Sequence, residues 1–223
     1  MTTQPTYSNP RRSIPVAKEG LPFIAIGLGL TVLAALIGSE VGVVLLGLIT
    51  LFVVYFFRDP DRPLSQEPNA IVAPADGKLL KVQALSPSES PLGMETFKIS
   101  IFMSLFNVHV NRSPAEGIVE NIVYEPGKFF SANLDKASDQ NEKNRIFIET
   151  SQLGKIMLVQ IAGLIARRIV CWVQPGERLH RGQRLGLIRF GSRVEIYVPA
   201  TCRIVAKQGQ RVKAGQTIIG YSR

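Results

Sequence analysis

The sequence predicts a mainly β domain that follows an N-terminal pair of apolar helices. Two long apolar runs fill most of residues 22–57. After residue 70, short runs rich in Val, Ile and Phe alternate with Gly and Pro, which is typical of strands joined by turns. No long segment after residue 57 has the 3.6-residue period of an amphipathic helix, so we expect only short helices there.

The apolar runs are residues 22–38 and 41–57, each with 17 residues and no charge. At 1.5 Å per residue, a helix of this length spans about 25 Å, the short end for crossing a bilayer. Only Ser39 and Glu40 separate the runs, so we expect a tight transmembrane hairpin; a re-entrant hairpin is the alternative. A cleaved signal peptide fits poorly, because the first run starts late and a second follows at once.

The charges around the hairpin indicate its orientation. Basic residues flank it on both sides, and the turn carries none: they are Arg11, Arg12, Lys18, Arg58 and Arg62. The positive-inside rule then places both ends in the cytoplasm, at the inner or plasma membrane. We expect Cys171 and Cys202 to stay reduced there as buried thiols.

This pattern divides the chain into four parts. Residues 1–21 form a cytoplasmic tail, residues 22–57 the hairpin, residues 58–69 a proline-rich linker and residues 70–223 the folded domain. Within the domain, strands are expected at 71–85, 96–103 and 156–161. Short helices are expected near 104–107 and 135–143.

An internal repeat suggests how the domain is built. Gly176, Arg178, Gly182 and Gln183 recur 33 residues later as Gly209, Arg211, Gly215 and Gln216. The repeated glycines suit turns and the aliphatic residues between them suit a core. With the segment Ala73-Pro-Ala-Asp-Gly-Lys, the repeat resembles a lipoyl/biotinyl-like barrel-sandwich hybrid. Carrier domains of that kind modify a lysine, usually beside Met, and no Met-Lys pair exists here.

The charge balance indicates an anionic partner. The chain has 26 basic and 17 acidic residues, for a formal charge of +9. Residues 167–223 carry twelve basic residues and only two acidic ones. Aromatic residues are sparse there and no recognition helix is apparent, so a lipid headgroup fits better than a nucleic acid. No Cys/His cluster has the spacing of a zinc site, so we expect no metal.

Four residues with reactive side chains remain ambiguous when each is considered alone. His180 lies in the repeat and is expected to be a solvated turn residue. His109 lies between Val108 and Val110 and could be structural or catalytic. Asp76 is followed by Gly, which is a turn signal. Ser192 follows Gly191 before a strand, where Gly-Ser usually marks a turn or bulge.

Taken together, these segments resemble the short form of the phosphatidylserine decarboxylase proenzymes, which are pyruvoyl-dependent and self-cleaving. The matching motifs are Ala75-Asp76-Gly77, Asn107-Val108-His109-Val110-Asn111-Arg112, the stretch 135–145 and Phe190-Gly191-Ser192-Arg193-Val194-Glu195. Long bacterial members have Leu-Gly-Ser-Thr where this chain has Phe-Gly-Ser-Arg. They also have a second histidine at the place of Phe106.

The resemblance implies a catalytic triad of Asp76, His109 and Ser192. Asp76 would orient His109, which takes the proton of Ser192. The serine would attack the carbonyl of Gly191, and elimination from the resulting ester would cut the chain between residues 191 and 192. The products would be a β chain, 1–191, and an α chain, 192–223, held together as a heterodimer that can oligomerise further. The α chain would begin with a covalent pyruvoyl group derived from Ser192, with no metal.

The resemblance also implies the substrate. The pyruvoyl carbonyl would accept the amine of phosphatidylserine and act as an electron sink, so that carbon dioxide leaves and phosphatidylethanolamine forms. Candidate substrate-binding residues are Arg193, Glu142, Asn144 and Arg145. An ether-lipid relative of phosphatidylserine is an alternative substrate. Two other functions stay open: a membrane adaptor with a lipoyl-like barrel, and a basic nucleic-acid-binding domain, which would leave the apolar hairpin unexplained.

Overall fold

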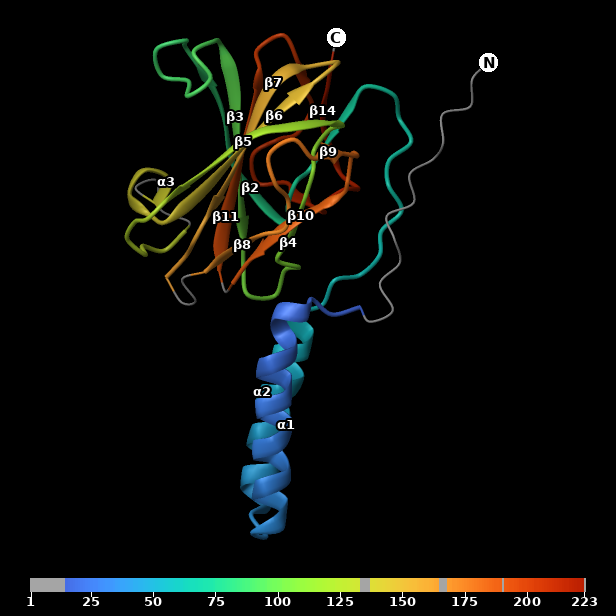
Figure 1. Ribbon diagram of the computed structural model, residues 1–223, viewed down its shortest axis with the longest axis vertical. Coiled ribbons are helices and arrows are strands. Elements are labelled where there is room, and N and C mark those ends of the chain that lie inside the picture. The colour runs from blue at the N-terminus through green and yellow to red at the C-terminus, as the bar shows by residue number, and fades with distance from the viewer. Residues whose placement is uncertain (1–14, 133–136, 165–167, 190, 223) are drawn as a thin grey trace. The chain divides into compact units, whose positions relative to one another are not determined.

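The computed structural model describes residues 15–132, 137–164, 168–189 and 191–222. Its contacts divide the chain into two compact units, a helical unit within Pro10–Asp61 and a β unit that begins at Arg62. The β unit therefore begins inside the segment expected as a linker. Figure 1 shows the helices of the first unit and the strands of the second.

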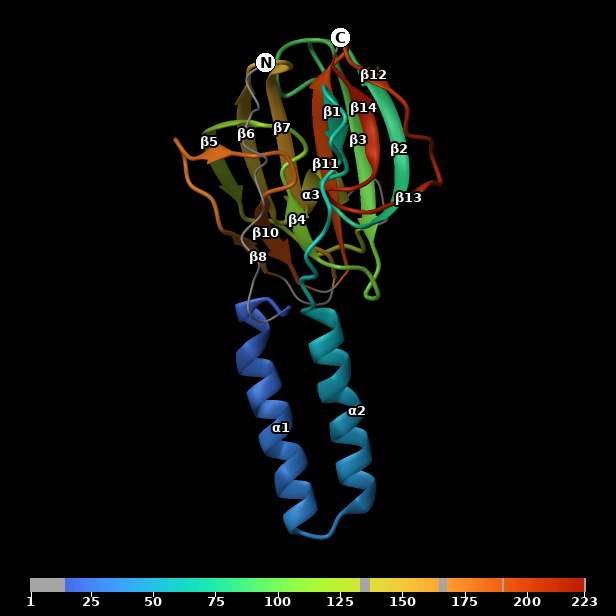
Figure 2. The same ribbon diagram turned by 90° about the vertical axis from the view of Figure 1, so that its right-hand side faces the viewer.

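The helical unit is a hairpin, as the sequence predicts. A short 3-10 turn at Lys18–Gly20 leads into α1 (Leu21–Leu36), and α2 (Glu40–Phe56) returns beside it (Figure 2). Gly38 has φ 75°, a left-handed conformation that ends a helix readily, and the Ser39 hydroxyl accepts from Gly42 N–H at 3.2 Å to cap α2. Gly27 lets the helices approach, because a Cβ there would lie 2.4 Å from Thr50 Oγ1.

The outer faces of both helices are apolar and exposed. Leu36 is 78% exposed and Ile37 73%, and most other Leu, Ile and Val side chains of the hairpin are also exposed, though less so. Among the described residues, one helical segment, Lys18–Leu36, is long and apolar enough to cross a membrane, and Glu40–Phe56 is a shorter apolar helix. An apolar surface of this extent is typical of contact with lipid.

The described part of the β unit contains three sheets and one short helix, α3 (Ala137–Gln140), so the mainly β prediction is confirmed. The strands are β1 (Ala70–Val72), β2 (Gly77–Leu85), β3 (Thr96–Met103), β4 (Val110–Arg112), β5 (Gly117–Glu125), β6 (Lys143–Thr150), β7 (Gly154–Ile161), β8 (Ile169–Cys171), β9 (Arg178–Leu179), β10 (Arg184–Ile188), β11 (Ser192–Pro199), β12 (Arg203–Ile204), β13 (Arg211–Val212) and β14 (Ile218–Tyr221).

A curled eight-stranded sheet has the order β13-β2-β3-β11-β7-β6-β5-β9, and two three-stranded sheets have the orders β1-β14-β12 and β4-β10-β8. The main core lies between one face of the large sheet and the small sheets, since Ile71, Leu185 and Ile219 join Ile99 and Ile196 in one buried cluster. The opposite face of the large sheet has a smaller apolar cluster around Met157, Val159 and Tyr197.

The strand predictions agree with the structure in part. The run 96–103 is β3 with the expected bounds, and 156–161 lies within β7. The run 71–85 is interrupted at 73–76, where Pro74 lacks an N–H for a ladder. The helix expected near 104–107 is a turn instead, because the Asn107 side chain accepts from Ser104 N–H at 2.9 Å and competes with helical bonding. Of the helix expected near 135–143, residues 135–136 lie outside the described residues and α3 occupies Ala137–Gln140.

The internal repeat corresponds to a two-fold relation within the β unit. Read from its two edges inward, the large sheet has the strands β13-β2-β3-β11 and β9-β5-β6-β7. Gly176 and Gly209 have φ of 84° and 85°, and Gly182 and Gly215 have 77° and 74°. Such values favour glycine, so the repeat is conserved between the halves in backbone conformation as well as in sequence.

The two-fold relation also joins two chain corners. Residues 74–77 (Pro-Ala-Asp-Gly), here the Asp76 corner, lead into β2, and residues 114–117 (Pro-Ala-Glu-Gly), here the Glu116 corner, lead into β5. Each strand end bonds to the proline of the other corner: Val72 N–H, at the end of β1, donates to Pro114 O at 3.0 Å, and Arg112 N–H, at the end of β4, donates to Pro74 O at 2.8 Å. The corners therefore have the same backbone frame.

Candidate active site

Ser192 is the first residue of β11, and its backbone pairs with Met103 at the end of β3. Val194, Ile196 and Val198 belong to the main core, so strand alternation turns Ser192 toward the same face. Its side chain is 0% exposed, and its Oγ has no hydrogen-bond partner within the described residues. A buried hydroxyl without a partner costs about 1–3 kcal/mol, and such groups in native proteins often mark reactive sites.

Gly191 has φ 63°, in the left-handed region. A Cβ there would meet no atom of the described residues within 4 Å, so backbone conformation favours glycine at this position. The carbonyl of Gly191 is thus presented from a geometry that other residues adopt only with strain. Phe190, on the other side, lies outside the described residues.

A row of buried amide side chains leads to the strand partner of Ser192. Asn144 Nδ2 donates to Gln160 Oε1 at 3.0 Å, and Gln160 Nε2 donates to Asn111 Oδ1 at 2.9 Å. Asn111 Nδ2 then contacts Met103 Sδ at 3.7 Å. All three amides are at most 3% exposed. Buried polar groups that bond to one another in this way fix a rigid local geometry.

His109 lies on the same side of its segment as Asn111, because side chains two residues apart in an extended chain share a face. Since Asn111 contacts Met103, the strand partner of Ser192, His109 belongs to the same end of the large sheet. His109 is 2% exposed, and its Nδ1 lies 3.0 Å from Asn107 O. A carbonyl can only accept, so Nδ1 carries the proton, and in the neutral ring Nε2 is then the basic nitrogen.

Asp76 also lies at this end of the sheet. It precedes β2, and Lys78 of β2 is in register with Phe102 of β3, which pairs with Arg193 of β11. Two strand spacings separate Asp76 from Ser192, or about 10 Å. Its carboxylate contacts Arg62 through both oxygens and accepts from Ala214 N–H at 2.8 Å, rather than contacting His109.

Arg193 and Arg145 lie on the other face of the sheet from Ser192. Arg193 is 3% exposed, and its Nη2 lies 2.8 Å from Glu195 Oε1 and donates to Ser100 Oγ at 2.9 Å. Burial, followed by the charge of Glu195, raises the pKa of the adjacent Tyr197. Arg145 Nε lies 3.1 Å from Glu125 Oε1. The four expected substrate-binding residues are therefore divided, and only Asn144 is joined to the polar row at the Ser192 end.

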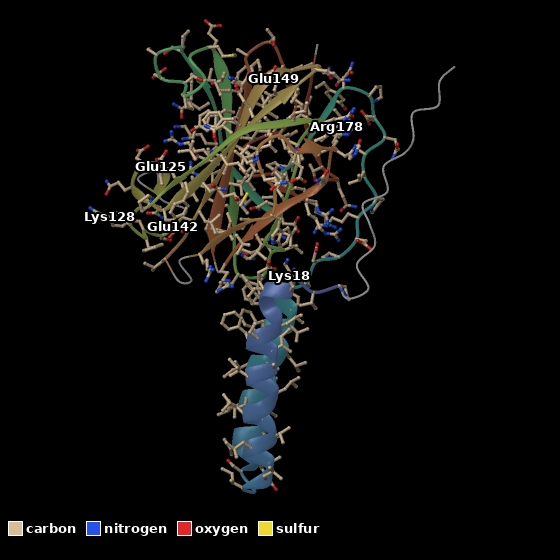
Figure 3. All side chains as sticks on the ribbon, in the orientation of Figure 1. Lys18, Glu125, Lys128, Glu142, Glu149 and Arg178 are labelled. Atoms are coloured by element: carbon tan, nitrogen blue, oxygen red, sulfur yellow. The ribbon has the colours of Figure 1, made fainter. Side chains whose placement is uncertain are left out.

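Glu142 is buried beside α3, where its N–H donates to Lys128 O at 3.0 Å. Burial, and then the charge and hydrogen bond of Glu142, raise the pKa of Tyr124. Figure 3 shows Glu125, Lys128 and Glu142 on the same side of the β unit. This charged group borders the strand β6 that carries Asn144.

A thiol also borders the polar row. Cys171 is half-buried, and its Sγ donates to Val173 O at 3.5 Å. Burial raises the pKa of the Cys171 thiol, and a hydrogen bond with the Asn144 side chain offsets part of that rise. Burial likewise raises the pKa of Cys202, and neither cysteine is in a disulfide. The described residues contain no group of three His, Cys, Asp or Glu side chains that could hold a metal ion.

The loops on both sides of Ser192 expose apolar side chains. The loop after β3 contains Phe106, which is 67% exposed, and the loop after β7 contains Leu164, which is 55% exposed. Because β3 and β7 both flank β11, these loops lie on either side of the Gly191–Ser192 bond. Arg168 is also exposed, just beyond the second loop. Apolar tips beside basic residues are typical of surfaces that contact anionic lipid.

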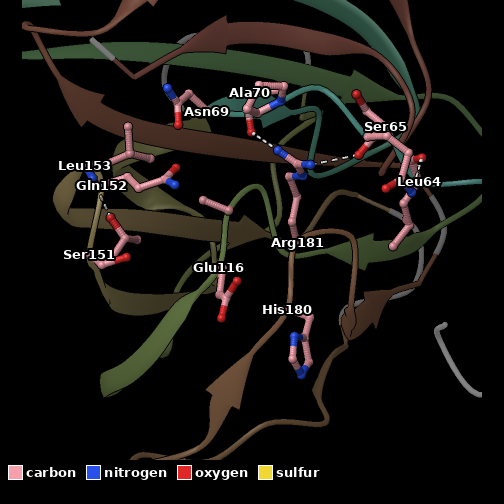
Figure 4. Close-up of a pocket in the computed structure, with 14 residues that line it drawn as sticks. Leu64, Ser65, Asn69, Ala70, Glu116, Ser151, Gln152, Leu153, His180 and Arg181 are labelled. Atoms are coloured by element: carbon pink, nitrogen blue, oxygen red, sulfur yellow. Dashed lines mark hydrogen bonds between the residues drawn. The ribbon is translucent and has the colours of Figure 1, made fainter. Parts of the chain in front are cut away.

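A cavity of about 390 Å³ lies at the opposite end of the large sheet. Figure 4 shows it between Leu64, Asn69 and the β6–β7 turn, with His180 and Arg181 on its wall. Arg181 donates to the carbonyl oxygens of Ser65, Glu67 and Ala70. The turn at 151–153 ends nine residues along the chain from the level of Ser192, about 30 Å away. The cavity is therefore not part of the site at Ser192.

Comparison with known proteins decides the family. A model of the phosphatidylserine decarboxylase family matches residues 49–220, most of the chain. The chain belongs to the phosphatidylserine decarboxylase family. This confirms the resemblance found from the motifs, and it makes the chain an enzyme of the carboxy-lyase type.

Relatives in the phosphatidylserine decarboxylase family match nearly their whole length. The chain is 46% identical over 207 residues to a phosphatidylserine decarboxylase proenzyme of Desulfotalea psychrophila, covering 93% of this chain and 96% of that one. The corresponding proenzyme of Syntrophus aciditrophicus is 49% identical, covering 92% and 96%. That of Cupriavidus metallidurans is 47% identical, covering 92% and 94%.

Sequence reasoning did not assign a role in the candidate site to Arg62, Asn111 or Gln160. Asn111 lies in one of the motifs that carry the family resemblance. Gln160 is an amide inside an otherwise apolar strand, which is a signal of a buried polar contact. Arg62 lay in the expected linker, and nothing in its local sequence indicates a partner in the β unit.

Proposed function

We propose that the chain decarboxylates phosphatidylserine to phosphatidylethanolamine and carbon dioxide, after cutting itself between Gly191 and Ser192. The observation that carries the proposal is the Ser192 hydroxyl, which is fully buried, lacks a hydrogen-bond partner among the described residues and follows a glycine at φ 63°. A structural serine at a strand start would normally satisfy its hydroxyl. An attacking serine needs its oxygen uncommitted and close to the preceding carbonyl.

In the proposed cleavage, His109 Nε2 removes the proton of Ser192 Oγ, and Asp76 stabilises the resulting imidazolium. Oγ attacks the carbonyl carbon of Gly191, the C–N bond breaks, and an ester replaces the amide. Elimination then breaks the Cα–H and Cβ–Oγ bonds of residue 192 and releases the carboxylate of Gly191. Water replaces nitrogen in the remaining dehydroalanine, ammonia leaves, and residue 192 becomes a pyruvoyl group.

The strand pairing supports an α chain that stays bound after the cut. The α chain, 192–223, contains β11 to β14. In it, β11 pairs with β3 and β7, β13 with β2, and β14 with β1 of the β chain, 1–191. β11 alone is in register with β3 over its full length, from Ser192 to Pro199. A heterodimer of the two cleaved chains therefore needs no new contacts, and further oligomerisation is a separate prediction.

A pyruvoyl group at residue 192 would supply an electron-accepting carbonyl to the substrate amine, without a metal. The position of residue 192 is compatible with such a group, because the pyruvoyl would take the place of the buried Ser192 side chain. His109, on the same side as Asn111, is proposed to return a proton to the substrate carbon. The hydrogen bonds from Asn144 to Gln160 and from Gln160 to Asn111 are proposed to keep the side of the site next to His109 rigid. Glu142, Arg193 and Arg145 stay predictions as substrate-binding residues.

The membrane is proposed as the second partner. The apolar segments 22–38 and 41–57 are proposed to anchor the chain with its β unit on the cytoplasmic side of the inner or plasma membrane, as the flanking basic residues predict. Phe106 and Leu164 are exposed on loops beside Ser192, which supports access of the site to lipid. We also propose that the two-fold β unit is a lipoyl-like barrel, on the basis of its repeated hairpins.

The test uses the full chain in phospholipid vesicles that contain phosphatidylserine. Wild type should form phosphatidylethanolamine and carbon dioxide in equal amounts, and a hydrazine reagent should label the α chain and stop the reaction. Ser192→Ala should form neither product. Arg181→Gln, at the remote cavity, is the matched control and should keep activity. Formation of phosphatidylethanolamine by Ser192→Ala would exclude the proposed mechanism.

A further inference from the structure

Arg62 makes the closest contacts of the Asp76 carboxylate. Its Nη1 bonds to Oδ1, and its Nη2 donates to Oδ2 at 2.7 Å. Nη1 also donates to Ala214 O at 3.1 Å, and Ala214 N–H donates back to Oδ1 at 2.8 Å. The two side chains are only 9% and 10% exposed. This bidentate, largely buried ion pair fixes both the position and the plane of the Asp76 carboxylate.

The contacts leave Asp76 able to act on a third group. An ionised carboxylate has about four acceptor positions, two on each oxygen. Oδ1 uses two of them, for Arg62 and for Ala214 N–H, and Oδ2 uses one, for Arg62. One acceptor position on Oδ2 therefore remains unused by these contacts, and the carboxylate keeps the negative charge that the proposed cleavage uses to stabilise the imidazolium of His109.

The Glu116 corner shows that the corner itself does not require such a pairing. Glu116 occupies the place of Asp76 in the same Pro-Ala-acid-Gly frame. Its partner is Arg178, at 2.8 Å, and the two side chains are 48% and 73% exposed. An exposed pair of this kind contributes little to stability. The buried pairing of Arg62 with Asp76 is therefore a feature of the Ser192 half alone.

We infer that Arg62 is a positioning residue for self-cleavage, acting through the carboxylate of Asp76. The inference rests on the proposed function. Arg62 follows α2 by six residues, so the segment that leaves the apolar helix supplies a part of the cleavage machinery. A chain that has lost this segment should lack the guanidinium at Asp76 and cut itself slowly, even with all the strands of its β unit present.

The experiment follows cleavage of newly made full-length chain in cell-free synthesis with phospholipid nanodiscs. Arg62→Gln should slow the formation of the fragments about 10- to 100-fold, because small displacements of a reacting group have effects of this size. Arg62→Lys, which keeps the charge but not the two-pronged geometry, should be intermediate. Arg181→Gln, which loosens the same segment at Ser65 without touching Asp76, is the matched control and should cleave within about 3-fold of wild type.

Two further readouts separate positioning from a general loss of structure. In the Asp76→Asn background, Arg62→Gln should have no additional effect on cleavage, since its route of action is already removed. Millimolar guanidinium should restore cleavage to Arg62→Ala but not to the Asp76→Asn double variant. A merely structural role would give additive losses and no rescue.

The outcomes are distinguishable. If wild type cleaves between residues 191 and 192 and Arg62→Gln cleaves at the same rate, the inference is wrong and the proposed function stands. Faster cleavage by Arg62→Gln would make Arg62 a lock on Asp76, which is the opposite of the inference. If wild type itself stays whole under these conditions, the proposed function fails first.

Discussion

The Asp76 corner and the Glu116 corner have the same backbone and differ in the use of their acidic residue. Each follows a short strand whose last residue bonds to the proline of the other corner, and each ends in a glycine that begins a long strand. At the Asp76 corner the carboxylate is buried and forms an ion pair with Arg62. At the Glu116 corner the carboxylate is exposed and pairs with Arg178. The shared backbone is thus a feature of the fold. Burial of the Asp76 carboxylate is what distinguishes the corner at the candidate site from the other corner.

The strands that follow differ in the same sense. In the Glu116 half, β6 and β7 are joined by the tight turn at 151–153, beside the cavity. In the Asp76 half, the equivalent strands β3 and β11 are not consecutive, so a new chain segment begins β11 with Ser192. Gly191 and Ser192 therefore lie where the Glu116 half has its hairpin turn, and no hairpin turn joins them to β3.

The largest expected effect separates the two carboxylates. Asp76→Asn should slow self-cleavage by about 10³- to 10⁴-fold, as loss of the orienting acid does in serine triads. Glu116→Gln should leave cleavage unchanged, because its side chain is exposed. A time course of fragment formation on denaturing gels measures both. Equal rates for the two variants would remove the distinction between the corners.

The histidines give the next comparison. His109→Gln should slow cleavage by about 10²- to 10⁴-fold, since it removes the proposed base. His180→Gln, at the remote cavity, should cleave at the wild-type rate. Both variants can be followed by intact mass after a fixed time. Cleavage of His109→Gln at the wild-type rate would assign the base to another group.

The glycines of the frame should respond equally in the two halves. A Cβ at Gly77 would lie 2.0 Å from Phe102 O, and one at Gly117 would lie 2.5 Å from Glu149 O. Gly77→Ala and Gly117→Ala should each lower the free energy of unfolding by about 2–4 kcal/mol, because backbone must move. Chemical denaturation of the Ser192→Ala chain in detergent, with each change added, measures this without interference from cleavage. A loss in one half only would argue against a shared frame.

The smallest effect is expected at the exposed pair. Arg178→Gln should change the free energy of unfolding by less than about 0.5 kcal/mol, since its guanidinium and Glu116 are largely in water. The same denaturation series measures it. A change as large as that of Gly117→Ala would mean that the Glu116 corner depends on its ion pair after all.

Local sequence patterns predicted much of the fold and the family, because they report local requirements. Alternating apolar residues gave β3 its bounds, and repeated glycines marked turns with matching φ values. The apolar hairpin followed from two uncharged runs. The helix expected at 104–107 was wrong because a single Asn side chain decides that turn, a contact that composition does not reveal.

The contacts of the candidate site could not be predicted, because they are non-local. Asn111, Gln160 and Asn144 come from three strands, and only the register of the sheets brings their amides together. Arg62 bonds to Asp76, which lies where the expected strand 71–85 is interrupted. Arg62 itself comes from a segment whose prolines and charges are typical of a linker. Ser192 was identified by its motif, whereas its burial and uncommitted hydroxyl required the structure.

The most direct measurement is the mass of the chain made in membranes, beside the Ser192→Ala variant. The account predicts two wild-type fragments, one ending at Gly191 and one comprising residues 192–223 with a blocked, pyruvoyl-mass first residue, and it predicts an intact variant. A folded wild-type chain that stays whole with an ordinary Ser192, or a variant that is cut at the same bond, would contradict it.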